Sequence, residues 1–217
     1  MLSCPAPPFR VTKDNAILLL MDPQRFATVP QEGLGQVAQE RGVLREFEEY
    51  YAQVEAALRN MQRLLAACRQ HGLKVIYTVL NSQYPDRNDL SRQLRVSGLP
   101  VPVGPAHADI RPEVAPHPEE MILPRGTYSP FASTPLLRVL EGEHVDTILL
   151  AGMLANVSVA LTAGEAADRG FGVILVWDAS ASETLDWHDH MRTALVGPLI
   201  RMRTTQQVIE MMEGTRT

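Results

Sequence analysis

The sequence predicts an α/β fold, organised as a single-domain, three-layer α/β/α structure around a mostly parallel sheet of about six strands. Short apolar runs of strand length alternate along the chain with stretches whose apolar residues have helical spacing. Strands that alternate with helices are joined by crossovers, which favour parallel pairing and helices on both faces of the sheet. The 217 residues are enough for one such domain with its own core.

The first half of the chain is expected to contain two strands and one long helix. Residues 16–22 form an apolar run that is too short for a helix and is ended by Pro23, which predicts a buried strand. In residues 44–71 apolar side chains recur every three to four positions until Gly72, so we expect a helix there. Residues 74–79 are typical of a second strand.

Three segments of the first half lack this regularity. Residues 81–119 are rich in Pro, Asp, Asn and Gly, which predicts a long loop with short helical pieces that determines the substrate. Residues 29–49, rich in Gln, Glu and Gly, are expected to cover a pocket or to make a subunit contact. The Pro-rich residues 1–13 are expected to be a tail in front of a domain that spans residues 14–217.

The second half is expected to contain four more strands and four helices. Gly170 ends one of these helices, and Asp178 ends the strand that follows it. The expected strands are 121–123, 147–152, 173–177 and 200–203. The expected helices are 134–140, 155–169, 185–195 and 206–212.

The composition argues against several kinds of partner. Twenty Lys and Arg against 25 Asp and Glu give a formal net charge of −5, which disfavours nucleic acid and leaves a small-molecule substrate. No apolar run approaches the ~20 residues of a membrane helix, so we expect no membrane partner. The chain opens without a secretory signal, so a cytoplasmic location with reduced Cys4 and Cys68 is expected.

Ligands of such sheets bind beyond the carboxyl ends of the strands, so the residues that follow strands are the candidates for a site. Acidic, basic, amide and aromatic side chains all occur at these positions. The candidates are Asp22, Gln24, Phe26, Arg125, Tyr128, Phe131, the segment 152–158 and Asp178.

Four stretches carry a resemblance to a known family. They are Ala-Ile-Leu-Leu-Leu-Met-Asp22-Pro-Gln24-Arg-Phe26, Ile122-Leu-Pro-Arg125-Gly-Thr-Tyr128-Ser-Pro-Phe131, Ile148-Leu-Leu-Ala-Gly152-Met-Leu-Ala-Asn156-Val-Ser158 and Gly170-Phe-Gly-Val-Ile-Leu-Val-Trp-Asp178. In this order and spacing they are similar to the isochorismatase-like hydrolases, most of which are cysteine amidohydrolases with an Asp, Lys, Cys triad. The resemblance covers roughly residues 14–212 and implies a Rossmann-type topology.

The resemblance implies catalytic roles for three residues. Asp22 matches the acid/base, Arg125 stands where Lys is usual, and Ser158 stands where the nucleophilic Cys is usual. The residues expected to contact the substrate are Gln24, Phe26, Tyr128, Phe131 and Leu154. No cofactor is expected, and no metal, because Asp22-Pro23-Gln24 replaces the Asp-x-His element of metal-binding relatives. Family members commonly form dimers or tetramers, so a homodimer or homotetramer is expected.

These replacements leave three hypotheses about function open. The first is a hydrolase of a vinyl ether or C–N bond, in which Asp22 is the acid/base and Arg125 holds a substrate carboxylate. The second is a degenerate member that binds a small acid or amide. The third is a serine amidohydrolase using Ser158, although serine nucleophiles usually need a His or Lys base and a guanidinium cannot serve as one. In the first hypothesis Arg125 is expected to lower the pKa of Asp22 and keep it ionised.

The resemblance also implies a non-proline cis peptide bond between Met153 and Leu154. This bond would turn the Leu154 N–H into the pocket, beside the Ser158 N–H at the start of the next helix. Two such donors would form an oxyanion hole for charge developing on a carbonyl oxygen. We further expect Asp22, Arg125 and Ser158 to converge in one pocket, with Asp22 and Arg125 close enough to pair.

Overall fold

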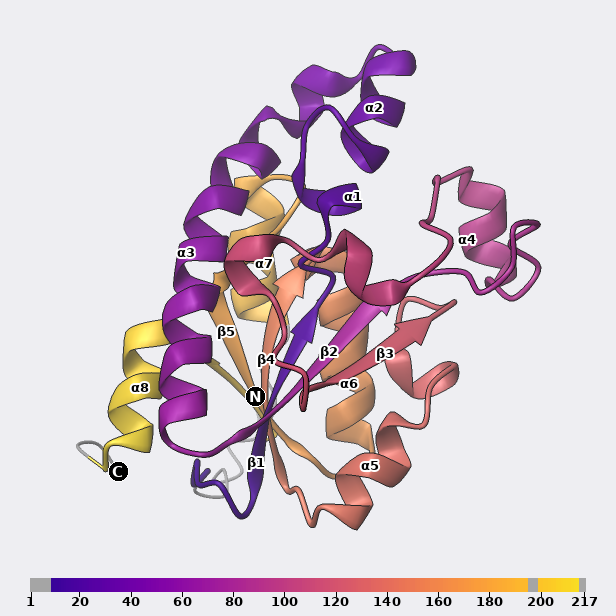
Figure 1. The fold of residues 1–217 in the computed structure, drawn as a ribbon. Coiled ribbons are helices and arrows are strands. Elements are labelled where there is room, and N and C mark those ends of the chain that lie inside the picture. Colours follow the sequence, from indigo (N-terminus) through magenta and orange to yellow (C-terminus); the bar gives the residue numbers. More distant parts are fainter. Residues whose placement is uncertain (1–8, 195–198, 215–217) are drawn as a thin grey trace.

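A six-stranded sheet organises the chain in the computed structural model, which describes residues 9–194 and 199–214 (Figure 1). Its order is β3-β2-β1-β4-β5-β6, and all of these neighbouring strands pair in parallel. The strands are β1 (Ala16–Met21), β2 (Lys74–Leu80), β3 (Met121–Arg125), β4 (Thr147–Met153), β5 (Gly172–Ala181) and β6 (Ile200–Arg203). The predicted α/β class is confirmed, and the sheet is parallel throughout.

Strand β1 lies at the centre of the sheet and is buried on both faces. Ile17 and Leu19 belong to one hydrophobic cluster, and Leu18 and Leu20 belong to the other, as the two-residue period of a strand requires. Helices α3 (Glu48–Gln70) and α8 (Thr205–Met212) cover one face, and α5 (Leu136–Gly142) and α6 (Ala160–Asp168) cover the other. This burial explains why the strand is uniformly apolar in the sequence.

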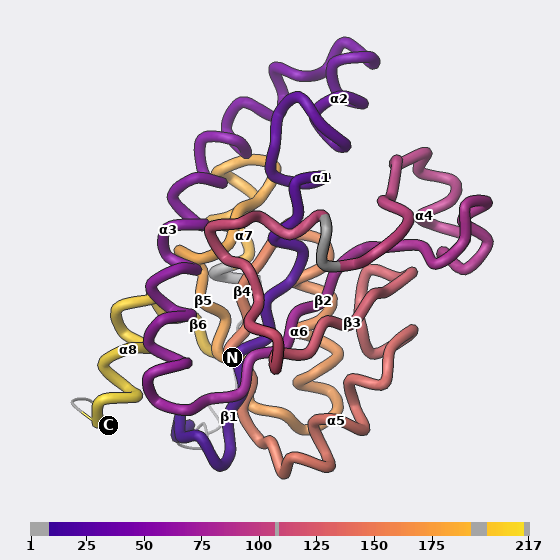
Figure 2. Tube along the Cα trace, in the orientation of Figure 1, coloured from indigo at the N-terminus to yellow at the C-terminus, as the bar shows by residue number. Residues whose placement is uncertain are grey.

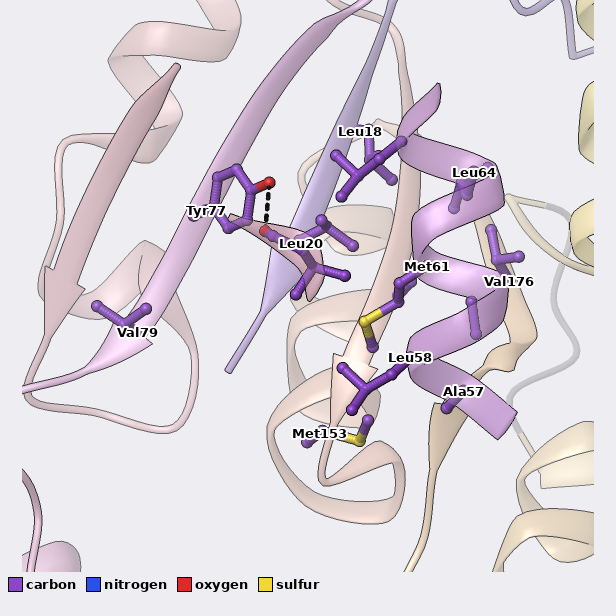
Figure 3. Packing of buried hydrophobic residues seen from close by; sticks show 14 of the residues in the cluster. Leu18, Leu20, Ala57, Leu58, Met61, Leu64, Tyr77, Val79, Met153 and Val176 are labelled. Atoms are coloured by element: carbon purple, nitrogen blue, oxygen red, sulfur yellow. Dashed lines mark hydrogen bonds between the residues drawn. The ribbon is translucent and has the colours of Figure 1, made fainter. Parts of the chain in front are cut away.

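Helix α3 supplies much of the larger cluster. Figure 3 shows its Leu58, Met61 and Leu64 facing the apolar side chains of β1. On the same face the hydroxyl of Tyr77 in β2 donates a hydrogen bond to the Val114 carbonyl over 3.0 Å. This bond fastens the end of the long segment 81–119 to the sheet.

Both irregular segments of the first half contain helices. Residues 29–49 hold α2 (Gly33–Glu40) and a short helix at Leu44–Phe47, and α1 (Arg25–Thr28) precedes them. Residues 81–119 hold α4 (Arg92–Ser97) and two further short helices, Ala106–Asp109 and Pro112–Val114, so the predicted loop with helical pieces is confirmed. Figures 1 and 2 show α2 and α4 beyond the carboxyl ends of the strands, where a ligand is expected to bind.

The structure corrects the prediction that β5 ends at Asp178. The strand continues to Ala181, and its register with β4 shifts between Leu150 and Gly152. The Asp178 carboxylate accepts bonds from Thr205 N (2.7 Å) and Thr205 Oγ1 (2.9 Å), so it caps the start of α8.

Smaller corrections concern ends of elements. The helix expected from residue 155 begins with a π-helical turn, Ala155–Val159, before α6. Helix α7 (Leu185–Ala194) occupies the segment expected at 185–195, whose last residue lies outside the described residues. In the segment expected to be a tail, Val11 is buried in the core and Phe9 packs against it, while residues 1–8 lie outside the described residues. Over the described ranges, none of the helices has the length and apolar character that crossing a membrane requires.

The close approach of β1 and β4 depends on Gly152, so a substitution there tests how tightly the two strands are packed. Gly152 has φ +150°, and a side chain there would overlap the carbonyl oxygen of Met21. We expect Gly152→Ala to lower the free energy of unfolding by roughly 1–3 kcal/mol, because both the dihedral and the space exclude a Cβ. Urea titration measures this change.

The matched control for this variant is Gly164→Ala. Gly164 lies within α6, and a Cβ added there would meet no atom within 4 Å, so alanine should raise stability by up to about 1 kcal/mol. Equal effects of the two substitutions would contradict the close approach at Gly152.

Candidate active site

A cavity of about 250 Å³ opens at the carboxyl edge of the sheet, at the switch point where the strand order reverses between β1 and β4. Asp22 reaches it from the end of β1, and Leu154 and Ser158 reach it from the segment after β4. Two of the three predicted catalytic residues, Asp22 and Ser158, therefore line one cavity.

Asp22 is held in one position by its backbone and by two hydrogen bonds. It has φ +50°, a conformation that Asp tolerates better than most residues. Its Oδ1 accepts a bond from Leu80 N over 3.0 Å, and its Oδ2 accepts one from Arg125 Nη2. Asp22 is 3% exposed, and its removal from water raises its pKa to about 6. The charge of Arg125 and the two bonds act in the opposite direction and are outweighed.

Arg125 pairs with Asp22 as predicted, but it does not line the cavity. It ends β3, and its side chain reaches across β2 to the end of β1. Its Nη1 donates to the carbonyl of Thr127, and its buried Nε has no partner among the described residues. Burial lowers the pKa of the guanidinium, against the effect of Asp22.

The place of Arg125 and its effect on Asp22 both bear on the expected roles of this residue. The side chain is completely buried behind Asp22, so the structure gives it no contact with a substrate carboxylate. Arg125 does lower the pKa of Asp22, as expected, but the desolvation of the carboxyl is the larger effect, so the net pKa is raised to about 6.

Ser158 lies in the π-helical turn that follows β4. Its hydroxyl has no hydrogen-bond partner among the residues that the structure describes, and its carbonyl accepts a bond from Thr162 Oγ1 at 2.7 Å. His188, a candidate base on α7, has its Nδ1 at 3.2 Å from the hydroxyl of Ser182. The second candidate on that helix, His190, packs its ring against Trp187. This arrangement does not activate a serine nucleophile.

The predicted cis peptide bond between Met153 and Leu154 is present. Leu154 and Ser158 both line the cavity, so the wall where the two N–H groups were expected is part of the site. The oxyanion hole itself stays a prediction.

The five residues expected to contact the substrate divide into two groups. Phe26, Tyr128 and Leu154 line the cavity. Gln24 does not, because its side-chain amide forms two bonds with the backbone of Leu80, one to the N–H (2.8 Å) and one to the carbonyl (3.0 Å). It ties the end of β1 to the end of β2.

Phe131 also lies away from the cavity. Its ring stacks on Phe171 with centroids 6.4 Å apart, and the guanidinium of Arg169 lies 5.1 Å from its centre. The structure thus gives both Gln24 and Phe131 positions in the packing of the fold, and the sequence did not distinguish them from cavity residues.

The cavity contains an acidic residue that the sequence did not suggest. Glu183 follows β5 and lines the cavity, and its Oε2 accepts a bond from Asn156 Nδ2 at 3.3 Å. The prediction that β5 ends at Asp178 hid it, because a strand ending there would leave Glu183 several residues beyond the edge of the sheet.

Both irregular segments contribute walls to the cavity. Of the two roles expected for residues 29–49, covering a pocket agrees with the structure, since Leu34, Val37 and Phe47 line the cavity. The alternative of a subunit contact stays a prediction. Ser97 and Leu99 add the contribution of residues 81–119. Throughout the described ranges no group of three or more His, Cys, Asp or Glu side chains could hold a metal ion.

Comparisons with known proteins agree on one family. The family model described as Isochorismatase domain matches residues 16–207. The chain is 32% identical to the isochorismatase of Bacillus subtilis over 130 residues, which are 59% of this chain and 41% of that protein. It is 29% identical to the maleamate amidohydrolase of Pseudomonas putida over 148 residues, which are 64% and 67% of the two chains.

Solved structures show the same fold at lower identity. A cysteine hydrolase from Pseudomonas syringae superposes with a TM-score of 0.79 at 21% identity, covering 99% of this chain and 100% of the other. The N-carbamoylsarcosine amidase of Thermoplasma acidophilum gives a TM-score of 0.64 at 22% identity, covering 88% and 96%. The matched residues make up less than half of the length of the Bacillus subtilis relative.

The buried ion pair gives a test of the site. Removing Arg125 leaves an uncompensated buried carboxylate, so we expect Arg125→Met to lower the free energy of unfolding by roughly 3–5 kcal/mol near pH 8. The pKa of Asp22 should rise further above about 6, because the lowering charge is gone. As pH falls to 5 the carboxyl takes up a proton, and the deficit against the parent should shrink.

The matched control is Arg169→Met, which removes a partly exposed ion pair with Glu165 and should cost under about 1 kcal/mol at either pH. Urea unfolding at pH 5 and pH 8 measures all three proteins. A deficit in Arg125→Met that grows on acidification would contradict the account of Asp22.

Proposed function

The chain belongs to the isochorismatase family, and on that premise we propose that it is a small-molecule hydrolase with Asp22 as the acid/base and no cysteine nucleophile. One observation carries the proposal. The Asp22 carboxyl is buried at the wall of a largely apolar cavity, and its pKa is raised to about 6. A carboxyl with this pKa holds a proton in an appreciable fraction of molecules near neutral pH, as a general acid must.

Acid catalysis at this position suits a vinyl ether. The proton of Asp22 adds to the terminal vinyl carbon, and the electrons of the double bond form the new C–H bond. Water adds to the resulting oxocarbenium carbon and returns a proton to the carboxylate, after which the hemiketal breaks into an alcohol and a ketone. No covalent enzyme intermediate is needed, so the loss of the cysteine does not prevent the reaction.

Hydrolysis of a C–N bond is less well supported, although relatives bear amidase names. An amide is a poor electrophile and calls for an activated nucleophile. Ser158 has no hydrogen-bonded base among the described residues, and Arg125 is paired with Asp22. A panel of isochorismate and simple amides in a coupled assay distinguishes the two reactions, and no turnover of any compound would favour a degenerate binding protein.

The raised pKa of Asp22 predicts the direction of the pH dependence. The active form is the protonated acid, so kcat/KM for a vinyl ether should fall about tenfold per pH unit as pH rises above about 6.

Asp22→Asn should lower kcat/KM by about 100-fold or more, since Asn tolerates the positive φ but has no proton to give. Asp109→Asn is the control, because its carboxylate accepts a bond from Gln24 and lies outside the cavity lining. An activity that rises through pH 6 would contradict the acid role.

Ser158→Ala separates this mechanism from a serine amidohydrolase. If Ser158 only orients substrate or water, the variant should keep kcat within about tenfold of the parent, the size of one lost hydrogen bond. A nucleophile would instead lose nearly all turnover. Single-turnover kinetics on the parent and the variant measure the chemical step, and a burst of product in the parent would indicate a covalent intermediate.

A further inference from the structure

The charged groups that line the cavity are unevenly distributed. Asp22 and Glu183 follow the ends of β1 and β5, and Asp22 is almost completely buried. Arg41 comes from the segment after α2, is exposed, and is the one cationic side chain among the described residues that line the cavity. The cavity is therefore acidic toward the sheet and basic toward solvent.

Arg41 has no ion-pair partner among the described residues. Its Nη2 donates one hydrogen bond, to the carbonyl of Ser97 at the end of α4, over 3.2 Å. A guanidinium carries five N–H donors in a planar fork, so most of its capacity is unused in this arrangement. In contrast, Arg125 and Arg169 are each paired with a carboxylate.

The wall between the two ends is mainly apolar, with Phe26, Leu34 and Val37 on it. A cavity of about 250 Å³ is smaller than the ~300–1,000 Å³ typical of drug-sized ligands, so the occupant is a small molecule with an apolar body. A carboxylate on that molecule would be repelled by Asp22 and Glu183 at the sheet. At the opposite end it would find a planar guanidinium able to bind it through two parallel hydrogen bonds.

We propose that Arg41 is a specificity-determining residue that recognises a carboxylate of the substrate, and that it thereby directs the reacting bond toward Asp22. The orientation rests on the proposed function, whereas recognition of the carboxylate does not require turnover. Arg41 thus takes the role expected of Arg125, which was to bind the substrate carboxylate. The guanidinium of Arg125 is instead bound to Asp22.

Paired ligands test this role without an assay of catalysis. Benzoate and its neutral analogue benzamide are titrated at pH 7.5 into the parent, Arg41→Gln, Arg41→Lys and Arg45→Gln, with ligand-observed NMR as the readout. Arg45 is the matched control, since it is exposed in the same segment and does not line the cavity. The parent should prefer benzoate, and Arg41→Gln should weaken benzoate binding about tenfold while leaving benzamide unchanged.

Arg41→Lys should keep part of the preference, and Arg45→Gln should keep all of it. The proposal is overturned if the parent shows no preference for benzoate, or if Arg45→Gln has the same effect as Arg41→Gln. It is also overturned if Arg41→Gln weakens the binding of both ligands equally, because the loss of a purely structural contact with Ser97 would have that effect. A benzoate preference lost in Arg41→Gln, together with no turnover of any vinyl ether or amide, would remove the proposed hydrolase function and leave the role of Arg41 standing.

Discussion

The ion pair between Asp22 and Arg125 is the interaction on which the chemistry of this site depends. Both side chains are buried and lose their water, and each compensates for much of the other's loss. The Leu80 N–H at Asp22 and the Thr127 carbonyl at Arg125 add one hydrogen bond each. The result is a balance in which burial raises the pKa of Asp22 and Arg125 limits the rise. Without burial the carboxyl would be an ordinary acid that is ionised at neutral pH, and without Arg125 it would be a neutral group that gives up its proton less readily.

The same pair determines what the side chain of Arg125 can do in the site. Arg125 connects the end of β3 to the end of β1 and binds Thr127 with its other terminal nitrogen, so its fork is used by the protein itself. In the proposed reaction it is a positioning residue, because it would act through Asp22. The cavity therefore needs another cation to recognise an anionic substrate, and Arg41 is the described residue that meets this need.

The sequence predicts the position of a residue where the residue type and its place in an element determine whether it is buried or lies at the edge of the sheet. A uniformly apolar strand such as β1 has to be buried, and a carboxylate directly after it has to lie at the carboxyl edge of the sheet. In the loop that follows a strand, the direction of a side chain depends on packing against distant residues, so the neighbouring sequence does not predict it. Phe131 and Tyr128 both follow β3, yet only Tyr128 lines the cavity, since Phe131 packs on Phe171 from a distant part of the chain.

The helix within residues 29–49 was missed for a related reason. This segment shows no helical periodicity in the sequence. Side chains at Gly33 and Gly35 would overlap the carbonyl oxygens of Phe26 and Pro30. They permit close packing of α2 on the preceding segment, which brings its apolar side chains over the cavity. That covering helps to exclude water from the carboxyl of Asp22 and thus contributes to the pKa that acid catalysis requires. A segment whose sequence looks irregular therefore supplies both the apolar cover above the acid and, in Arg41, the cation at the entrance.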